Sequence, residues 1–145
     1  MPSFSIRMDH VRLDVTDVAR SAAFYAAALH LEQVVRYELD RRTILQMAPA
    51  GMPAGVELWQ EDGLLPAPHP SQHLAFSVDD VPGIVAHVRA LGYQIVEEPR
   101  RIGGETVAFL SDPDGHLIEI NDFRGRGVAE AGRAPDSSSS SKVVE

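Results

Sequence analysis

The feature that most constrains this chain is an internal repeat. Three segments of the first half match three segments of the second half without gaps, at an offset of 62 or 63 positions. The matching segments are 9–18 with 72–81, 28–34 with 90–96, and 56–58 with 118–120. Self-similarity at one fixed offset indicates a duplicated structural unit. The sequence therefore predicts two copies of one module, with equivalent residues at equivalent places.

The first copy predicts a strand, a helix and three further strands. Residues 9–15 alternate polar and apolar side chains, which is typical of a strand with one face in the core. Thr16 and Asp17 are favourable helix caps, and the alanine-rich segment after them has apolar residues at helical spacing. The further strands are expected at 31–39, 43–48 and 55–60.

The second copy predicts the same order. A strand is expected at 72–78, followed by a helix that Asp79 and Asp80 cap and Gly92 ends. The remaining strands are expected at 93–97, 106–110 and 116–121. The fold class is therefore α+β, with two tandem βαβββ modules. In the first copy, His30 aligns with Gly92, so we expect it to cap the C-terminal end of the first helix.

The modules are expected to form one domain, residues 1–123. They span about 8–60 and 72–123, and a Pro-rich linker at 61–71 joins them. Residues 124–145 contain a serine run and little apolar content, which predicts a disordered tail. A chain of 145 residues with 44% hydrophobic residues is consistent with one domain of this kind.

Composition excludes several classes of function. The net charge of −8 leaves no general basic surface for nucleic acid or anionic lipid. There is no cysteine, which excludes disulfides, thiolate metal sites and a cysteine nucleophile. The only lysine, Lys142, lies in the predicted tail. The sequence shows no signal peptide and no membrane span, so we expect a cytoplasmic protein.

Four polar residues form two matched pairs in the repeat. His10 aligns with His73 and Glu57 aligns with Glu119. All four are out of phase with the apolar residues that should face the helices, so we expect them on the helix-free face of their sheets. Two imidazole nitrogens and two carboxylate oxygens suit one divalent ion, Zn, Ni, Co, Mn or Fe(II), with water in the open positions.

Glu119 also stands out locally. The residues Asp112-Pro113-Asp114-Gly115 predict a turn, and Glu119 follows between Ile118 and Ile120 in a strand that should be well covered. An isolated carboxylate there needs water or a cation. A single histidine or glutamate on a strand is usually a solvated surface residue. The matched pairs favour a metal site instead, since a duplication kept only for structure would retain apolar positions and turns.

The chain resembles the vicinal oxygen chelate superfamily, the group of glyoxalases, bleomycin-resistance proteins and extradiol dioxygenases. The resemblance covers about residues 8–123, and its order of His, Glu, His, Glu is most similar to glyoxalase I. The features that carry it are the two modules, His10, Glu57, His73, the ending at 112–119 and the stretch 103–109.

The resemblance implies curved sheets around a metal-binding trough. It also implies a metal-dependent lyase or isomerase that stabilises an enediolate of a small oxygenated metabolite. Glu119 would be the base and Glu57 its counterpart for reprotonation. Such sites are commonly assembled across a homodimer, but the sequence leaves open whether this site closes within one chain or between two.

Two alternatives remain open. The first is a protein that binds a drug or natural product in the same trough without turnover. The second is an extradiol ring-cleaving dioxygenase, which would use two histidines and one glutamate around ferrous iron. Glu57 counts against the second alternative, because it would occupy a position that such an enzyme leaves free.

Arg12, Trp59 and Ser77 share the trough-facing phase and are candidates to line a substrate pocket. Trp59, the only tryptophan, is a possible stacking platform for a flat substrate. Asp14 and Glu61 stand where glyoxalase I has an arginine and an asparagine that bind glutathione, so the added negative charge argues against an anionic glutathione adduct.

The other histidines have no repeat partner in this pattern. We expect His69, His87 and His116 at the surface, with His116 near the metal ligands at most.

Overall fold

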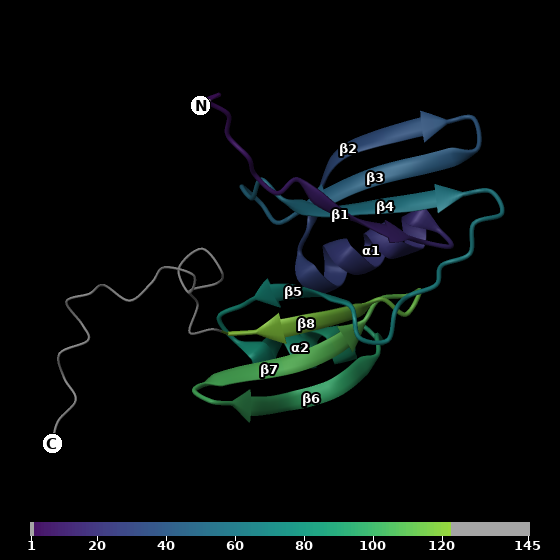
Figure 1. Ribbon diagram of the computed structural model, residues 1–145. Helices are drawn as coiled ribbons and strands as arrows, with labels where there is room; N and C mark the ends of the chain where they lie inside the picture. Colours follow the sequence, from purple (N-terminus) through teal and green to yellow (C-terminus); the bar gives the residue numbers. More distant parts are fainter. Residues whose placement is uncertain (1, 123–145) are drawn as a thin grey trace, which may run out of the picture.

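The computed structural model describes residues 2–122, and the predicted tail at 124–145 lies outside this range (Figure 1). The order of elements confirms the two βαβββ modules. The first module consists of β1 (His10–Asp14), α1 (Val18–Leu29), β2 (Glu32–Leu39), β3 (Arg42–Ala48) and β4 (Gly55–Glu61). The second consists of β5 (His73–Ser77), α2 (Val81–Ala90), β6 (Ile95–Ile102), β7 (Glu105–Ser111) and β8 (Leu117–Asn121).

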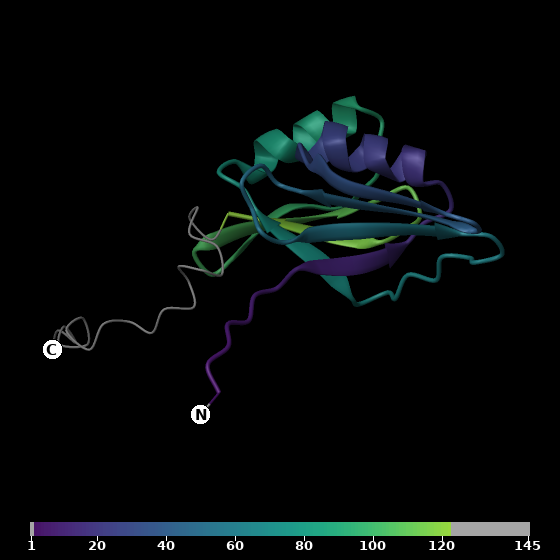
Figure 2. The same ribbon diagram turned by 90° about the horizontal axis from the view of Figure 1, so that it is seen from above.

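Each module forms one four-stranded mixed sheet. The strand orders are β1-β4-β3-β2 and β5-β8-β7-β6, so equivalent strands occupy equivalent places. The edge strands β1 and β5 pair in parallel with β4 and β8, and all other pairs are antiparallel. Both helices lie on one side of the two sheets, which leaves the opposite side without a helix (Figure 2).

The two modules share one apolar core between the sheets and the helices. Fully buried side chains from both halves belong to a single cluster, among them Phe24, Leu58, Val88 and Ile118. The ring of Phe24 on α1 meets that of Tyr93 edge to face, with centroids 4.8 Å apart. The side chains of opposite phase on the strands therefore face the helix-free side.

Helix ends follow the sequence closely. Asp17 accepts hydrogen bonds from the backbone N–H groups of Ala19 and Arg20 at the start of α1, and Asp80 accepts one from Gly83 in α2. His30 ends α1 in a left-handed conformation with φ of 56°, and its N–H donates to the Ala26 carbonyl. The prediction that His30 is a C-terminal cap is confirmed.

One strand departs from its predicted bounds. The expected strand at 93–97 begins later and continues past Pro99, as β6 (Ile95–Ile102). Because β6 is an edge strand and Pro99 has no partner in its register with β7, the missing N–H of the proline is tolerated there. The irregular register between Glu97 and Arg100 accommodates the ring.

Neither of the two helices within residues 2–122 is long and apolar enough to cross a membrane. The cytoplasmic location stays a prediction.

Candidate functional site

We call the His–Glu pair of each module, with its polar neighbours, a half-site. The first half-site consists of His10, Glu57, Gln46 and Asp9 and lies near the start of the edge strand β1. His10 Nε2 lies 3.3 Å from Glu57 Oε2, and Gln46 Nε2 donates to the same oxygen at 2.8 Å. Asp9 Oδ2 lies 2.5 Å from His10 Nδ1. Glu57 is buried in the middle of its sheet. One ring nitrogen of His10 is therefore held by a carboxylate, and the other is directed to Glu57.

The second half-site lies at the equivalent place in the second sheet and consists of His73, Glu119, Asn121, Ser77 and the carbonyl of Ser71. His73 Nε2 lies 2.9 Å from Glu119 Oε2, and its Nδ1 lies 3.3 Å from the Ser71 carbonyl oxygen. Asn121 Nδ2 donates to Glu119 Oε1 at 2.9 Å. Ser77 Oγ donates to Asn121 Oδ1 at 2.8 Å.

Strand register explains why the two pairs have the same geometry. Glu57 on β4 is aligned with Arg12 on β1, and Glu119 on β8 is aligned with Ala75 on β5. Each histidine lies two residues earlier on its edge strand, on the same face as its glutamate because side chains alternate with a period of two. The repeat thus reproduces one diagonal contact twice.

The chemistry of these pairs fits a divalent metal ion. A histidine that ligates a metal usually gives its second ring nitrogen to a carboxylate or a carbonyl, which fixes the tautomer. Both His10 and His73 have Nδ1 at such an acceptor and Nε2 at a carboxylate oxygen. Two nitrogens and two oxygens form a donor set for Zn, Ni, Co, Mn or Fe(II).

One chain keeps the two pairs apart. Within residues 2–122, no three histidine, aspartate or glutamate side chains are grouped so that they could hold an ion. The structure therefore brings His10 to Glu57 and His73 to Glu119, but does not bring all four together in one copy.

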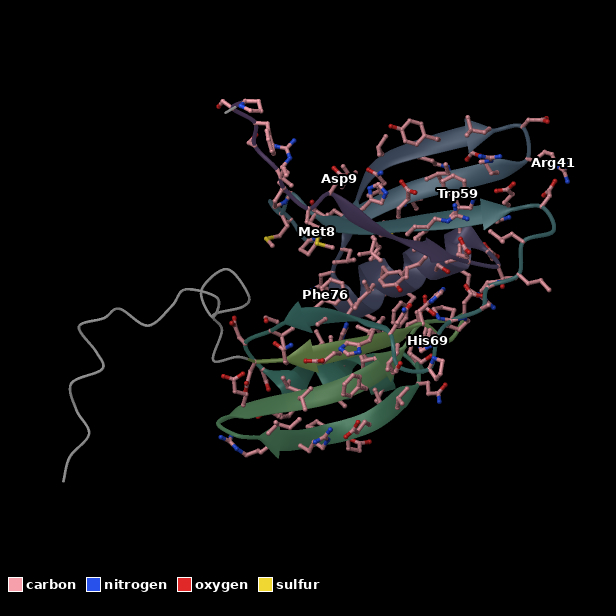
Figure 3. The ribbon with its side chains drawn as sticks, in the orientation of Figure 1. Met8, Asp9, Arg41, Trp59, His69 and Phe76 are labelled. Carbon is pink, nitrogen blue, oxygen red and sulfur yellow. The ribbon has the colours of Figure 1, made fainter. Side chains whose placement is uncertain are left out.

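A cluster of arginine and tryptophan side chains lies beyond the first half-site on the same face. We call Arg12, Trp59 and Arg42, with Asp14 and Glu61, the Arg–Trp cluster. The guanidinium carbons of Arg12 and Arg42 lie 4.0 Å and 5.3 Å from the centroid of the Trp59 ring. Figure 3 shows Asp9 near the start of β1 and Trp59 farther along the same module. The two arginines come from the strands on either side of β4, so they limit access to the indole as a stacking platform.

Both acidic residues of the Arg–Trp cluster are engaged. Asp14 Oδ1 lies 2.7 Å from Arg12 Nε, and Glu61 Oε1 lies 3.5 Å from Arg42 Nη2. Glu61 also accepts a hydrogen bond from Trp59 Nε1 at 2.9 Å. Two carboxylates and two guanidinium groups leave the cluster without net charge, which weakens the electrostatic argument against an anionic substrate.

A cleft of about 730 Å³ lies between the edge strands β1 and β5. Arg12 and Asp14 line it from the first module, and His73 and His116 line it from the second. The linker contributes His69, which lies between the modules in Figure 3. The Pro-rich linker thus forms one wall of this cleft, next to one of the candidate ligands.

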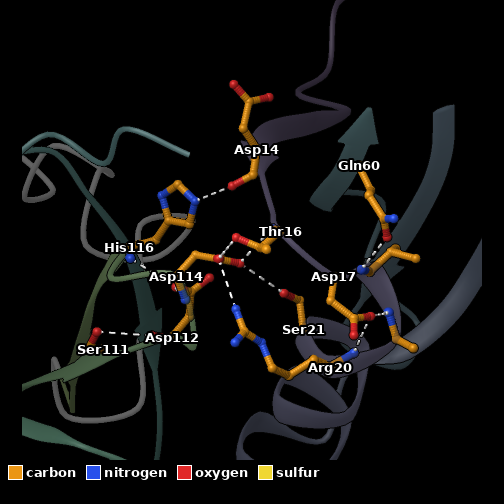
Figure 4. Close-up of polar contacts among 12 residues, drawn as sticks. Asp14, Thr16, Asp17, Arg20, Ser21, Gln60, Ser111, Asp112, Asp114 and His116 are labelled. Atoms are coloured by element: carbon orange, nitrogen blue, oxygen red, sulfur yellow. Dashed lines mark hydrogen bonds and ion pairs between the residues drawn. The ribbon is translucent and has the colours of Figure 1, made fainter. Parts of the chain in front are cut away.

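The turn before β8 has a second role that the sequence analysis missed. Asp114 reaches across to the start of α1 in the other module (Figure 4). Its carboxylate accepts hydrogen bonds from the Thr16 N–H at 3.2 Å, the Thr16 hydroxyl at 2.6 Å and the Ser21 hydroxyl at 3.4 Å, and it pairs with Arg20 at 3.0 Å. The turn therefore ties the two modules together as well as preceding the last strand.

Two neighbours of Asp114 belong to the same interface. Asp112 is buried and accepts a hydrogen bond from the Tyr25 hydroxyl at 2.9 Å. His116 is half-buried, with Nε2 2.7 Å from the Asp14 carbonyl oxygen (Figure 4). His116 was expected at the surface, and it is instead half-buried at the contact between the modules, where one ring nitrogen lies at a backbone carbonyl of the other module. Partners 87 to 102 residues away leave no local signal in the sequence.

Burial shifts the pKa values of two residues at this interface, Asp112 and Tyr25. Removal from water raises the pKa of Asp112 above its usual value, although hydrogen bonds from His116 and Tyr25 oppose the change. Burial, together with the adjacent Asp112 carboxylate, raises the pKa of Tyr25 well above the usual phenol value. Tyr25 therefore acts as a neutral donor.

Comparison with known proteins agrees with this geometry. Lactoylglutathione lyase of Haemophilus influenzae is 31% identical over 120 residues, which cover 77% of this chain and 88% of that protein. Lactoylglutathione lyase GLX1 of Arabidopsis thaliana is 42% identical over 50 residues, and the match covers 33% of this chain and only 18% of that protein.

Among solved structures, glyoxalase I of Leishmania major, described as trypanothione-dependent, superposes with a TM-score of 0.73 at 26% identity. The match covers 90% of this chain and all of that one. The model of the Glyoxalase/Bleomycin resistance protein/Dioxygenase superfamily matches residues 7–120. The chain therefore belongs to the Glyoxalase/Bleomycin resistance protein/Dioxygenase superfamily and is glyoxalase I-like in fold.

Proposed function

We propose that this protein is a metal-dependent lyase or isomerase of the glyoxalase type. The observation that carries the proposal is the pair of equivalent His–Glu contacts, His10 with Glu57 and His73 with Glu119, on the helix-free face. Relatives named lactoylglutathione lyase support the reaction class. The substrate would be a small oxygenated molecule that reacts through an enediolate.

We also propose that the active form is a homodimer. Each half-site of one chain offers one imidazole and one carboxylate, and a mononuclear site needs more ligands than that. A second copy would place its His73 and Glu119 opposite His10 and Glu57 of the first. The helix-free faces of the two sheets would then form one trough.

The four residues would hold one divalent ion, which when bound would polarise a carbonyl oxygen of the substrate. A glutamate takes a proton from the carbon beside that carbonyl, and a proton is returned to the neighbouring carbon. The family resemblance gives the first step to Glu119 and the second to Glu57. Arg12, Trp59 and Ser77 are proposed to contact the remainder of the substrate.

Metal analysis of the purified protein, with and without chelator, tests this function directly. We expect about one divalent ion per site, and turnover of the hemithioacetal of methylglyoxal and glutathione that stops on chelation. The variants His10→Ala, His73→Ala and Glu119→Ala should each lose both properties, and Glu57→Ala should lose turnover. His87→Ala is the control and should keep both, because His87 is exposed on α2, on the helix side of the sheets. A protein with no stoichiometric metal and with turnover unaffected by chelator would contradict the proposal.

A non-catalytic binding protein is the second candidate. The 730 Å³ cleft between the modules favours it, because this volume accommodates a small molecule without any metal. Tight binding of a natural product by metal-free protein, without conversion, would support this candidate over the enzyme. A ring-cleaving dioxygenase is less favoured, because Glu57 accompanies His10 at the position that ferrous iron would need open. Oxygen uptake with a catechol would support it.

A further inference from the structure

The two half-sites hold their glutamates differently. Both oxygens of Glu119 are engaged, Oε1 by Asn121 at 2.9 Å and Oε2 by His73 at 2.9 Å. The polar contacts of Glu57 within the described chain use Oε2 alone, from Gln46 at 2.8 Å and His10 at 3.3 Å. Glu119 is therefore fixed at both oxygens, whereas Glu57 keeps Oε1 available.

The side chain that fixes Glu119 is itself held in place. Asn121 is 2% exposed, and Ser77 donates to its amide oxygen at 2.8 Å, which orients the amide nitrogen toward Glu119. A buried amide that loses such a partner has no water to replace it. A movement of Glu119 away from His73 would leave the Asn121 donor without its acceptor, so the chain of hydrogen bonds opposes that movement.

The first module has no counterpart to the Ser77–Asn121 pair, and its amide donor to Glu57 is Gln46, from β3. The residues at the positions equivalent to Ser77 and Asn121 are Asp14 and Trp59. Asp14 pairs with Arg12 and Trp59 donates to Glu61, so both are directed into the Arg–Trp cluster and away from Glu57. A glutamate held at both oxygens is thus a property of the second half-site alone, since Gln46 and His10 both contact Oε2 of Glu57.

We propose that Asn121, braced by Ser77, is a positioning residue that fixes Glu119 as the permanent ligand, and that Glu57 is the carboxylate that moves the proton. The proposal rests on the function proposed above and reverses the roles that the family resemblance suggests. A proton passes from the substrate carbon to Glu57 Oε1, and the C–H electron pair moves to the adjacent carbonyl. Glu57 then returns the proton to the former carbonyl carbon, which takes the C=C electron pair of the enediolate. The hydroxyl proton of the first carbon passes to the former carbonyl oxygen, so that the carbonyl and the alcohol change places.

The first experiment is a titration of chelator-treated protein with Co²⁺, followed by its visible absorption. Asn121→Leu removes the donor to Glu119, and we expect it to raise the Kd for Co²⁺ about 10- to 100-fold. Ser77→Ala should raise the Kd less. The double variant should match Asn121→Leu alone, because Ser77 acts through Asn121. Additive losses, or a Kd and spectrum like those of the unmodified protein, would overturn the positioning role.

Gln46→Leu is the matched control, because it removes the amide donor to Glu57 in the other half-site. We expect it to change the Kd less than Asn121→Leu does. An equal or larger change would show that the two half-sites hold their glutamates alike.

The roles of the two glutamates are separated by Glu57→Gln and Glu119→Gln. We expect Glu119→Gln to weaken Co²⁺ binding at least as much as Asn121→Leu. Glu57→Gln should keep the Kd within about tenfold while turnover of the methylglyoxal–glutathione hemithioacetal is lost. A larger loss of Co²⁺ affinity in Glu57→Gln than in Glu119→Gln would overturn the assignment of Glu119 as the permanent ligand. This holds even if the hemithioacetal is not a substrate.

A crystal structure of metal-free Asn121→Leu protein separates this inference from the function on which it rests. We expect Glu119 to leave its 2.9 Å contact with His73. If the unmodified protein binds no Co²⁺, the proposed function fails while the positioning of Glu119 is still decided by this structure. An unchanged Glu119 would overturn the positioning role.

Discussion

The two half-sites have the same backbone arrangement but different neighbouring side chains. In both modules a histidine on the edge strand contacts a glutamate on the next strand through the same register. Farther along the same strands, the first module has the Arg–Trp cluster, while the second has Ser77 and Asn121 turned back to Glu119. The comparison indicates that duplication preserved the contact within each His–Glu pair, and that the positions two residues beyond each glutamate diverged.

The largest expected effect tests whether both half-sites ligate one ion. His10→Ala and His73→Ala should each raise the Kd for Co²⁺ by more than about 100-fold, since each removes a ligand from a shared site. Isothermal titration calorimetry measures both values. A loss confined to one variant would mean that only one module binds the ion, and the comparison between equivalent half-sites would no longer hold.

The next effect concerns the interface that holds the modules together. Asp114→Ala removes a nearly buried carboxylate with four polar contacts to the start of α1, so we expect a loss of about 2–3 kcal/mol in the free energy of unfolding. Urea denaturation measures this change. Asp79→Ala, an exposed aspartate before α2, is the control and should change stability by less than about 0.5 kcal/mol. Equal effects would mean that the turn does not tie the modules.

A smaller effect is expected in the Arg–Trp cluster. Arg12→Met removes the guanidinium over Trp59 and should cost about 0.5–1 kcal/mol of stability, because both groups are partly exposed. Trp59 is the only tryptophan, so its fluorescence emission should shift in this variant. Arg36→Met, which loses a contact to Glu38 on the same strand, should leave the emission unchanged. A shift in both variants would indicate a general change in the first sheet.

The smallest effect is a change in how the free energy of unfolding varies with pH. Because burial raises the pKa of Asp112 in the folded protein, the folded state binds this proton more tightly than the unfolded state. Its contribution to stability is fully present below the usual carboxyl pKa and is lost as the pH rises through the raised folded value. Asp112→Asn cannot ionise, so its stability relative to the unmodified protein should increase with pH across that window.

Urea denaturation at a series of pH values measures the difference, with the exposed Asp62→Asn as the control. Parallel curves for Asp112→Asn and the unmodified protein would show that the ionisation of Asp112 is not coupled to folding.

The sequence alone determined the two βαβββ modules and the strand phase. It also determined which residues are equivalent in the repeat, His10 with His73 and Glu57 with Glu119. These follow from periodicity, caps and repetition, which are local properties or comparisons of the chain with itself. The same period of two that places Leu58 in the core places Glu57 on the helix-free face. The residues of the candidate site could thus be named in advance, and their metal role stays a prediction.

Only the tertiary structure decided what lies between the modules. The contacts of Asp114 with Thr16 and Arg20, and the cover over His116, join residues about 100 positions apart, so no local pattern predicts them. Docking also kept the two His–Glu pairs apart within one chain. The difference in support between Glu57 and Glu119 depends on side-chain direction at Trp59 and Asn121. Strand phase places Trp59 and Asn121 on the helix-free face of their sheets. Trp59 donates to Glu61, whereas Asn121 donates to Glu119.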